Sequence, residues 1–269
     1  MSAEGKHNLV VAGIGPVEVT VSDGGTGHAF LLIHGGAGPQ SVAGFANLLS
    51  TKGARVITPT HPGFGGTPRP DSLDSIAGLA RVYAALLDQL DLDDVTVIGN
   101  SIGGWIAAEM ALLGSPRIGS LVLVDAAGIE VAGHPIADFF SLTLDQVAEF
   151  SYHDPDRFRI DPTTMSEEQR AVFAGNRASL AIYGGTGMTD TTLRGRLASV
   201  TVPALVVWGD SDQMVDQDYG RAYAAAIPGA TFVLLTDTGH VPQIETPEQL
   251  LTPVWDFVAA HARVQQRGA

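Results

Sequence analysis

The sequence predicts an α/β fold in which a mostly parallel β-sheet carries helices on both faces. Three observations support this prediction. Short, continuously apolar segments recur along the chain, as in strands that are buried on both faces of a parallel sheet. Helical patterns of apolar residues separate several of these segments, which is typical of right-handed βαβ units. The alternation stops in one long internal stretch, which indicates an insertion.

The expected strands are of two kinds. A period-two alternation indicates a half-buried strand, and an uninterrupted apolar run indicates a fully buried one. The first kind occurs at 16–22, and the second kind follows at 29–33, 54–58, 95–98, 120–124, 203–208 and 231–235.

Three helices are expected from apolar spacing and end signals. Apolar residues recur at helical spacing from Ile76 to Leu90 and from Ile102 to Leu113. Near the end of the chain, 246–249 reads Thr-Pro-Glu-Gln, which predicts a helix start with a capping box and proline at the first helical position.

The interrupted stretch spans residues 129–197. It is helical in pattern and irregular, and Ser166 to Gln169 forms a second candidate capping box. Its richness in aromatic residues distinguishes it from a flexible linker. We therefore expect one core formed by 1–128 and 198–269, with a helical cap inserted at 129–197. The aromatic residues are Phe139, Phe140, Phe150, Tyr152, Phe158, Phe173 and Tyr183.

Composition limits the class of function. With 29 acidic and 15 basic side chains, the 269-residue chain carries a formal charge of −14 and no basic run, which argues against nucleic acid or anionic lipid as a partner. No apolar run approaches the ~18–20 residues of a membrane span, and no secretory signal is evident. We expect a cytoplasmic protein with a small-molecule substrate; a homodimer is left open. The absence of cysteine excludes disulfides, cysteine-bound metals and a thiol nucleophile, and we expect neither metal nor cofactor.

The sharpest motif is Gly99-Asn100-Ser101-Ile102-Gly103, which follows a predicted buried strand and precedes a predicted helix. A serine on such a tight strand-to-helix turn projects its hydroxyl into open space, as the G-x-S-x-G nucleophile elbow requires. The helix N-terminus adds partial positive charge beside the reacting atom. Ser101 is the expected nucleophile, and the Ile102 N–H is the expected first oxyanion donor. An ordinary glycine-rich turn is the alternative interpretation.

A second glycine cluster, His34 to Gly38, ends an earlier strand. Elbow enzymes take their second oxyanion donor from such a loop, and small residues let the backbone approach the substrate. Gly36 N–H is the expected donor, with Ala37 as the alternative.

The nucleophile needs a base, and the chain has eight histidines. Of these, His240 alone lies in the loop between the last predicted strand and the last helix, so it is the expected base. We expect His34 and His61 to form structural hydrogen bonds.

The base needs an acid to orient it. The segment after Trp208 offers Asp210 and Asp212, and Asp212 is preferred because it lies three residues beyond Gly209. Asp210, and Asp125 after the preceding strand, are alternatives.

Through these motifs together, the chain resembles members of the α/β-hydrolase superfamily that carry a helical cap. The likeness runs from about residue 16 to 260 and rests on HGGAG, HPGFGG, GNSIGG, WGDSD and GHVPQIETPEQL. It implies an eight-stranded sheet and a triad in the order Ser, Asp, His. The fold hosts many activities, so the likeness does not fix the substrate.

Within the superfamily, GNSIGG and HGGAGP are similar to motifs of meta-cleavage-product hydrolases, which split carbon–carbon bonds. Those enzymes often carry tryptophan after the histidine, where this chain has Val241, and use a cap arginine, for which Arg177 is the candidate. A carboxylesterase or lactonase is therefore the expectation, with the carbon–carbon hydrolase as runner-up and a ligand-binding receptor of the same fold as the alternative of another class. Expected substrate contacts are Ala37, Asn100, Phe139, Phe140, Tyr183, Arg177 and Val241.

Overall fold

Eight strands form one sheet in the structure, a computed structural model that describes residues 3–261. Their spatial order is β1-β2-β4-β3-β5-β6-β7-β8. All pairs from β4 to β8 are parallel, whereas β2 runs antiparallel to both β1 and β4. The predicted fold class is thereby confirmed. The strands are β1 (Ala3–Val11), β2 (Gly15–Gly25), β3 (Ala29–Ile33), β4 (Arg55–Pro59), β5 (Val95–Asn100), β6 (Ile118–Val124), β7 (Ala204–Gly209) and β8 (Thr231–Leu235).

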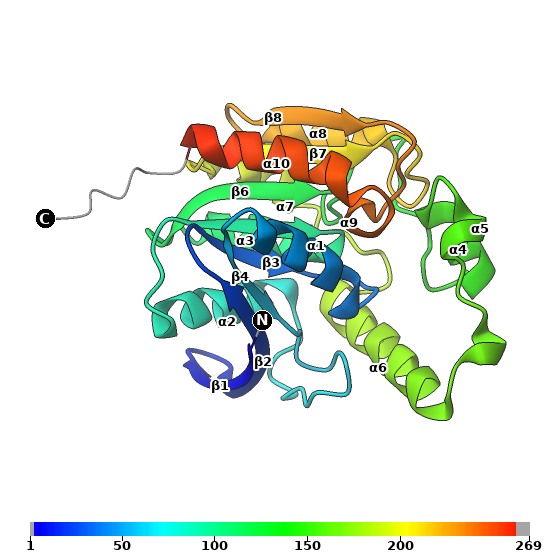
Figure 1. The fold of residues 1–269 in the computed structure, drawn as a ribbon, viewed down its shortest axis with the longest axis horizontal. Helices are drawn as coiled ribbons and strands as arrows, with labels where there is room; N and C mark the ends of the chain where they lie inside the picture. The colour runs from blue at the N-terminus through cyan, green and yellow to red at the C-terminus, as the bar shows by residue number, and fades with distance from the viewer. Residues whose placement is uncertain (1–2, 262–269) are drawn as a thin grey trace, which may run out of the picture.

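Helices lie on both faces of the sheet and enclose two apolar cores (Figure 1). Helices α2, α3 and α8 contribute to one core, and α1 and α10 to the other. The helices are α1 (Gln40–Thr51), α2 (Ile76–Gln89), α3 (Ile102–Leu112), α4 (Leu144–Ser151), α5 (Pro155–Phe158), α6 (Glu167–Gly184), α7 (Leu193–Arg196), α8 (Gln217–Ala226), α9 (Pro242–Glu245) and α10 (Pro247–His261), with short 3-10 turns η1 (Pro162–Thr164) and η2 (Leu197–Ser199). Within residues 3–261, no helix combines the length and apolar character needed to span a bilayer.

The apolar runs form strands because the sheet is covered on both sides. Every residue of β3, β5 and β7 is buried, which explains why these segments show no alternation. The sequence prediction lacks β1, which pairs with β2 at the sheet edge. Only Leu9 and Val11 of this strand are buried, so its sequence carries little strand pattern.

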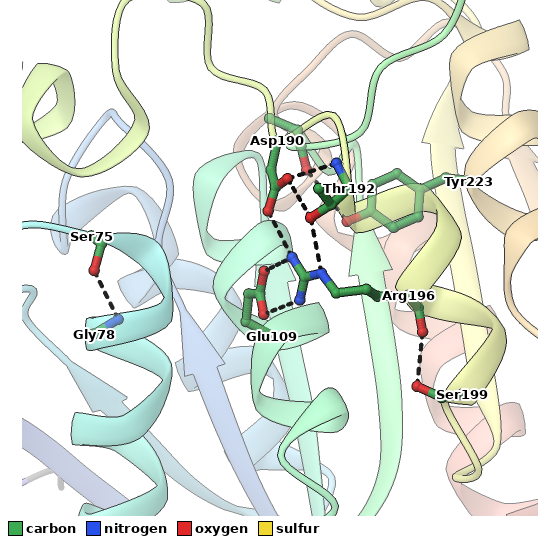
Figure 2. Close-up of polar contacts among 9 residues, drawn as sticks. Ser75, Gly78, Glu109, Asp190, Thr192, Arg196, Ser199 and Tyr223 are labelled. Atoms are coloured by element: carbon green, nitrogen blue, oxygen red, sulfur yellow. Dashed lines mark hydrogen bonds and ion pairs between the residues drawn. The ribbon is translucent and has the colours of Figure 1, made fainter. Parts of the chain in front are cut away.

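Side-chain caps define the helix starts. The Ser75 hydroxyl accepts the Gly78 N–H at the start of α2 (Figure 2). Ser166 and Gln169 form the predicted capping box of α6. Helix α10 begins at Pro247 as expected, but the prediction of a capping box there is wrong. The Gln249 side-chain amide donates to the Thr236 carbonyl, and the Thr246 N–H donates to the Pro242 carbonyl, so Gln249 does not reach back to Thr246.

Helices α4 to α7 lie between β6 and β7 in the chain, inside the stretch expected to be inserted at 129–197. Figure 1 shows α4, α5 and α6, in green, beyond the end of the sheet toward which the β8 arrow points. The extreme ends of the expected core, residues 1–2 and 262–269, lie outside the described residues.

The end of this inserted stretch is tied to α3 by an ion-pair cluster (Figure 2). The Arg196 guanidinium donates to both carboxylate oxygens of Glu109 at 2.8 and 2.6 Å and to Asp190 at 2.7 Å. The Asp190 N–H in turn bonds the Gly128 carbonyl at 2.7 Å. Because the Glu109 side chain is only 10% exposed, Arg196 neutralises a nearly buried charge and joins the insertion to the helix that follows Ser101.

Candidate active site

Ser101 lies at the tip of the turn between β5 and α3. Its backbone has φ 57° and ψ −122°, a strained combination that the surrounding packing must hold. A Cβ on Gly99 would collide with the backbone of Gly103, and a Cβ on Gly103 would collide with the Ile33 carbonyl. The two glycines are therefore required for the turn to fit against β3. The Ser101 N–H bonds the Val124 carbonyl at 3.0 Å, which fixes the turn to β6.

The structure brings Ser101, His240 and Asp212 into one hydrogen-bonded chain, the candidate triad. His240 Nε2 lies 2.9 Å from the Ser101 hydroxyl, and His240 Nδ1 lies 2.8 Å from Asp212 Oδ2. The other carboxylate oxygen of Asp212 accepts the N–H groups of Met214 and Val215 at 2.8 and 3.0 Å. These contacts fit a triad geometry in which the acid orients the imidazole toward the hydroxyl. Asp210 is exposed and takes no part in this series of hydrogen bonds.

The loop that carries His240 is held from three directions. The His240 N–H donates to the carbonyl of Ser151, the last residue of α4, at 2.7 Å. The His240 carbonyl accepts a hydrogen bond from the Asn100 amide at 2.9 Å. Gln243 on α9 donates to the Asn100 side-chain oxygen at 3.0 Å. Asn100, expected as a substrate contact, thus has its buried amide engaged in aligning the histidine loop with the serine turn.

The expected oxyanion donors belong to two segments that adjoin Ser101, the start of α3 and the glycine loop His34 to Gly38. Ile102 is the first residue of α3, where a helix has N–H groups without intrahelical partners. A Cβ on Gly35 would lie 3.1 Å from the Ser101 Cβ, so the glycine loop passes directly against the nucleophile. Neither Ile102 N–H nor Gly36 N–H donates to a protein acceptor within residues 3–261. The assignment of these two amides stays a prediction.

Two buried histidines support the glycine loop. The His34 ring donates from Nδ1 to the Gly35 carbonyl and accepts the His61 N–H, at 2.8 and 3.1 Å. The His61 ring bonds the His34 carbonyl at 2.9 Å through Nε2 and the Tyr83 hydroxyl through Nδ1. Every ring nitrogen has a partner that suits a neutral imidazole. Burial lowers the pKa of His34 to about 4 and that of His61 well below its usual range.

This network predicts acid sensitivity. Because the folded state holds both rings neutral, the unfolded chain binds more protons once the pH falls below about 6.5, and stability is lost. Between about pH 7 and about pH 5, each ring contributes a loss of about 2 kcal/mol. Urea unfolding at the two pH values measures this loss of unfolding free energy. In His61→Gln the loss should be smaller than in the wild type by the contribution of one histidine ring. The exposed His153→Gln variant should match the wild type, and equal slopes in all three proteins would contradict the prediction.

The second half of helix α6 packs onto two loops, the glycine loop at 34–38 and the loop at 61–66, which are together called the motif loops. Leu180 covers Gly36, since a Cβ there would lie 3.0 Å from the leucine side chain. The Asn176 amide oxygen accepts the Gly65 N–H at 2.8 Å, and the Ser179 hydroxyl donates to the Gly63 carbonyl at 2.9 Å. The Tyr183 hydroxyl, expected as a substrate contact, donates to the Pro62 carbonyl at 2.8 Å and is buried.

The remaining expected substrate contacts are spread over the insertion and the loops. Arg177 donates to the carbonyls of Phe139 and Phe140 at 3.0 and 2.7 Å and stacks on the Phe139 ring. Val241 is buried next to His240. Ala37 lines a groove of about 870 Å³ between α1 and α6 that Ser101 and His240 do not line.

Sequence reasoning misses Gln243, Ser151 and Asn176 as parts of the site. Gln243 follows His240 by three residues, so a buried amide one helical turn after the base is a local signal that could have found it. Ser151 and Asn176 act from the insertion, and no pattern near the motifs points to them.

Comparison with known proteins agrees with this architecture. Residues 30–252 match the sequence model of the alpha/beta hydrolase family. The chain is 29% identical to a 2-hydroxy-6-oxononadienedioate/2-hydroxy-6-oxononatrienedioate hydrolase of Burkholderia vietnamiensis, with 96% of each chain covered. It is 30% identical to Lipase 3 of Moraxella sp., over 83% of this chain and 75% of the lipase.

Among solved structures, a thermophilic esterase from Thermogutta terrifontis superposes with a TM-score of 0.77 at 22% identity, over 96% of this chain and all of the esterase. At this identity the likeness concerns the fold alone. The family match covers most of the chain and includes both motif loops, the serine turn and the histidine loop. The chain belongs to the alpha/beta hydrolase family.

Proposed function

We propose that the protein is a serine hydrolase that cleaves carboxylic esters or lactones of small apolar molecules through an acyl-enzyme. The observation that carries the proposal is the hydrogen-bonded chain from Ser101 through His240 to Asp212. Such a chain, on a serine held at a strand-to-helix turn, is what nucleophilic acyl transfer requires.

The first half-reaction forms the acyl-enzyme. His240 Nε2 takes the Ser101 proton as Oγ attacks the carbonyl carbon, and the protonated imidazole then gives that proton to the departing alkoxide. Asp212 holds Nδ1–H, which fixes the tautomer and stabilises the imidazolium. In the second half-reaction His240 deprotonates water, which attacks the acyl carbon, and the proton returns to Ser101 as the acid leaves.

The oxyanion of each tetrahedral intermediate would lie between the N–H groups of Ile102 and Gly36. Both amides lack a protein acceptor within the described chain; Ile102 directly follows Ser101, and Gly36 directly follows Gly35, which packs against the Ser101 Cβ. Backbone donors fixed before the reaction stabilise the developing charge without reorganisation, and one such donor is typically worth about 3–4 kcal/mol.

The apolar substrate class is inferred from the insertion. Phe139 and Phe140 pack edge to face, with ring centroids 5.5 Å apart, and Leu180 covers the glycine loop. Small-molecule sites are generally apolar with few polar anchors, so these apolar side chains favour an apolar substrate.

Carbon–carbon hydrolysis is the second candidate. It is supported by the Burkholderia hydrolase, whose named substrates are 2-hydroxy-6-oxononadienedioate and 2-hydroxy-6-oxononatrienedioate and which aligns over 96% of both chains. Arg177 is the cap residue that would hold a dienoate carboxylate. Two backbone carbonyls and a phenylalanine ring already engage its guanidinium, which favours the ester hydrolase.

A substrate panel separates the candidates. We expect kcat/KM for short p-nitrophenyl esters or a lactone to exceed that for a ring-fission dienoate, because Arg177 is engaged by the protein itself. A clear preference for the dienoate would establish the second candidate. Labelling with a fluorophosphonate tests both against a ligand-binding receptor, since folded protein that does not label has no activated serine.

A further inference from the structure

Asp125 is a buried carboxyl group that the proposed mechanism does not use. It follows β6, and its side chain is inaccessible to solvent. Oδ1 accepts the Gly209 N–H at 2.9 Å. No group within residues 3–261 donates a hydrogen bond to Oδ2. A buried carboxylate oxygen without a donor carries a large desolvation cost, so the ionisation state of Asp125 needs an explanation.

The neighbours of Asp125 make a second negative charge expensive. Potential ligand atoms of Asp125, Asp212 and His240 all lie within 4.8 Å of one another. The negative charge of Glu245 on α9 also raises the pKa of Asp125. Two carboxyl groups this close in a dry interior do not both ionise, and one of them keeps a proton.

Hydrogen bonding decides which carboxyl group is charged. Asp212 accepts three N–H bonds, from Met214, Val215 and His240, whereas Asp125 accepts one. Three donors favour the charged form at Asp212. Burial, and after it the charge of Asp212, raises the pKa of Asp125 well above its usual range.

We propose that Asp125 is a protonated positioning acid whose Oδ2–H donates a hydrogen bond to the Asp212 carboxylate. The bond gives the orphaned oxygen its partner and adds a fourth donor to the acid that orients His240. It holds Asp212 in one rotamer while the charge on the imidazole alternates during turnover. The inference rests on the proposed function, because it takes Asp212 as the ionised partner of the base.

Substitution at Asp125 tests the protonation state through activity. Asparagine reproduces a protonated aspartate, since its oxygen can accept from Gly209 and its N–H₂ can donate to Asp212. Alanine removes both bonds. We expect Asp125→Ala to lower kcat by about 10- to 100-fold and to shift the pH profile of kcat/KM. The size of the effect is taken from metal sites, where loss of a residue that orients a metal-binding side chain has this cost. Asparagine should rescue kcat to within about threefold of the wild type. A loss in Asp125→Asn as large as in Asp125→Ala would overturn the proposal.

Two further measurements need no substrate, so they test Asp125 even if the ester-hydrolase proposal fails. An infrared difference spectrum of wild type against Asp125→Asn at neutral pH should show the C=O stretch of a protonated carboxyl group. From about pH 4 upward, the wild type should lose stability with rising pH faster than Asp125→Asn, because the folded state holds a proton that the unfolded chain has released. Absence of the band, or equal pH slopes, would show an ionised Asp125 and refute the inference whether or not Asp125→Ala folds.

Discussion

Replacing Ser101 with alanine should lower kcat by about 10⁶-fold and abolish fluorophosphonate labelling. The hydroxyl is the group that attacks the substrate, and loss of the nucleophile of a triad costs about this factor. The fold should tolerate the change, because alanine has the same steric demand as serine at φ 57°. One hydrogen bond to His240 is lost, worth about 1 kcal/mol, so Tm should shift by no more than about 4 °C.

The measurement is a rate assay on an aryl ester beside thermal unfolding of the same preparation. Ser120 provides a matched control, since it is a buried serine on β6 whose hydroxyl bonds Thr96, away from the triad. Ser120→Ala should keep its labelling. Residual turnover in Ser101→Ala above about 1% of wild type would mean that another group is the nucleophile.

The second large effect is expected from Asp212→Asn, which should lower kcat by about 10⁴-fold. An amide in place of Oδ2 can present an N–H to His240 Nδ1, which forces the imidazole into the tautomer that cannot accept the serine proton. The substitution is nearly isosteric, so the loss should appear in kcat with little change in KM.

Asp210→Asn is the matched control for that change. The two aspartates lie two residues apart, but Asp210 is exposed and accepts from the Ser211 hydroxyl and the Thr238 N–H. Turnover of Asp210→Asn should stay within about threefold of the wild type, since surface changes have small effects. A reversed pattern would move the acid to Asp210.

The parts of the site that the sequence predicts are those fixed by short-range geometry. Gly99 and Gly103 are read as an elbow because a strand, a tight turn and a helix follow one another within a few residues. The same holds for His34, whose ring bonds the Gly35 carbonyl of its own loop, whereas the bond from His61 to the His34 carbonyl joins two loops 27 residues apart. The structure agrees with these expectations because no distant residue has to be known to derive them.

The features that the sequence does not predict depend on pairs far apart in the chain. Asn100 and Gln243 are separated by 143 positions, and their bond to one another decides how the histidine loop sits on the serine turn. The relation of Asp125 to Asp212 likewise exists only because β6 and β7 are neighbours in the sheet. Strand β1 escapes prediction for another reason: its mostly exposed residues follow no periodic pattern that burial would impose.

The contact of Arg196 with Glu109 bears on how an insertion of this kind can be exchanged between relatives. A swap of residues 129–197 as one cassette would remove Arg196 and Asp190 together, and would leave Glu109 on α3 charged, nearly buried and without its partner. A replacement segment taken from a relative therefore needs an arginine of its own near its C-terminal end. Otherwise the junction must lie before Asp190, so that Asp190 and Arg196 are kept. We propose that the transferable module is shorter than the interruption in the strand–helix pattern indicates, because Arg196 near its end pairs with Glu109 on α3.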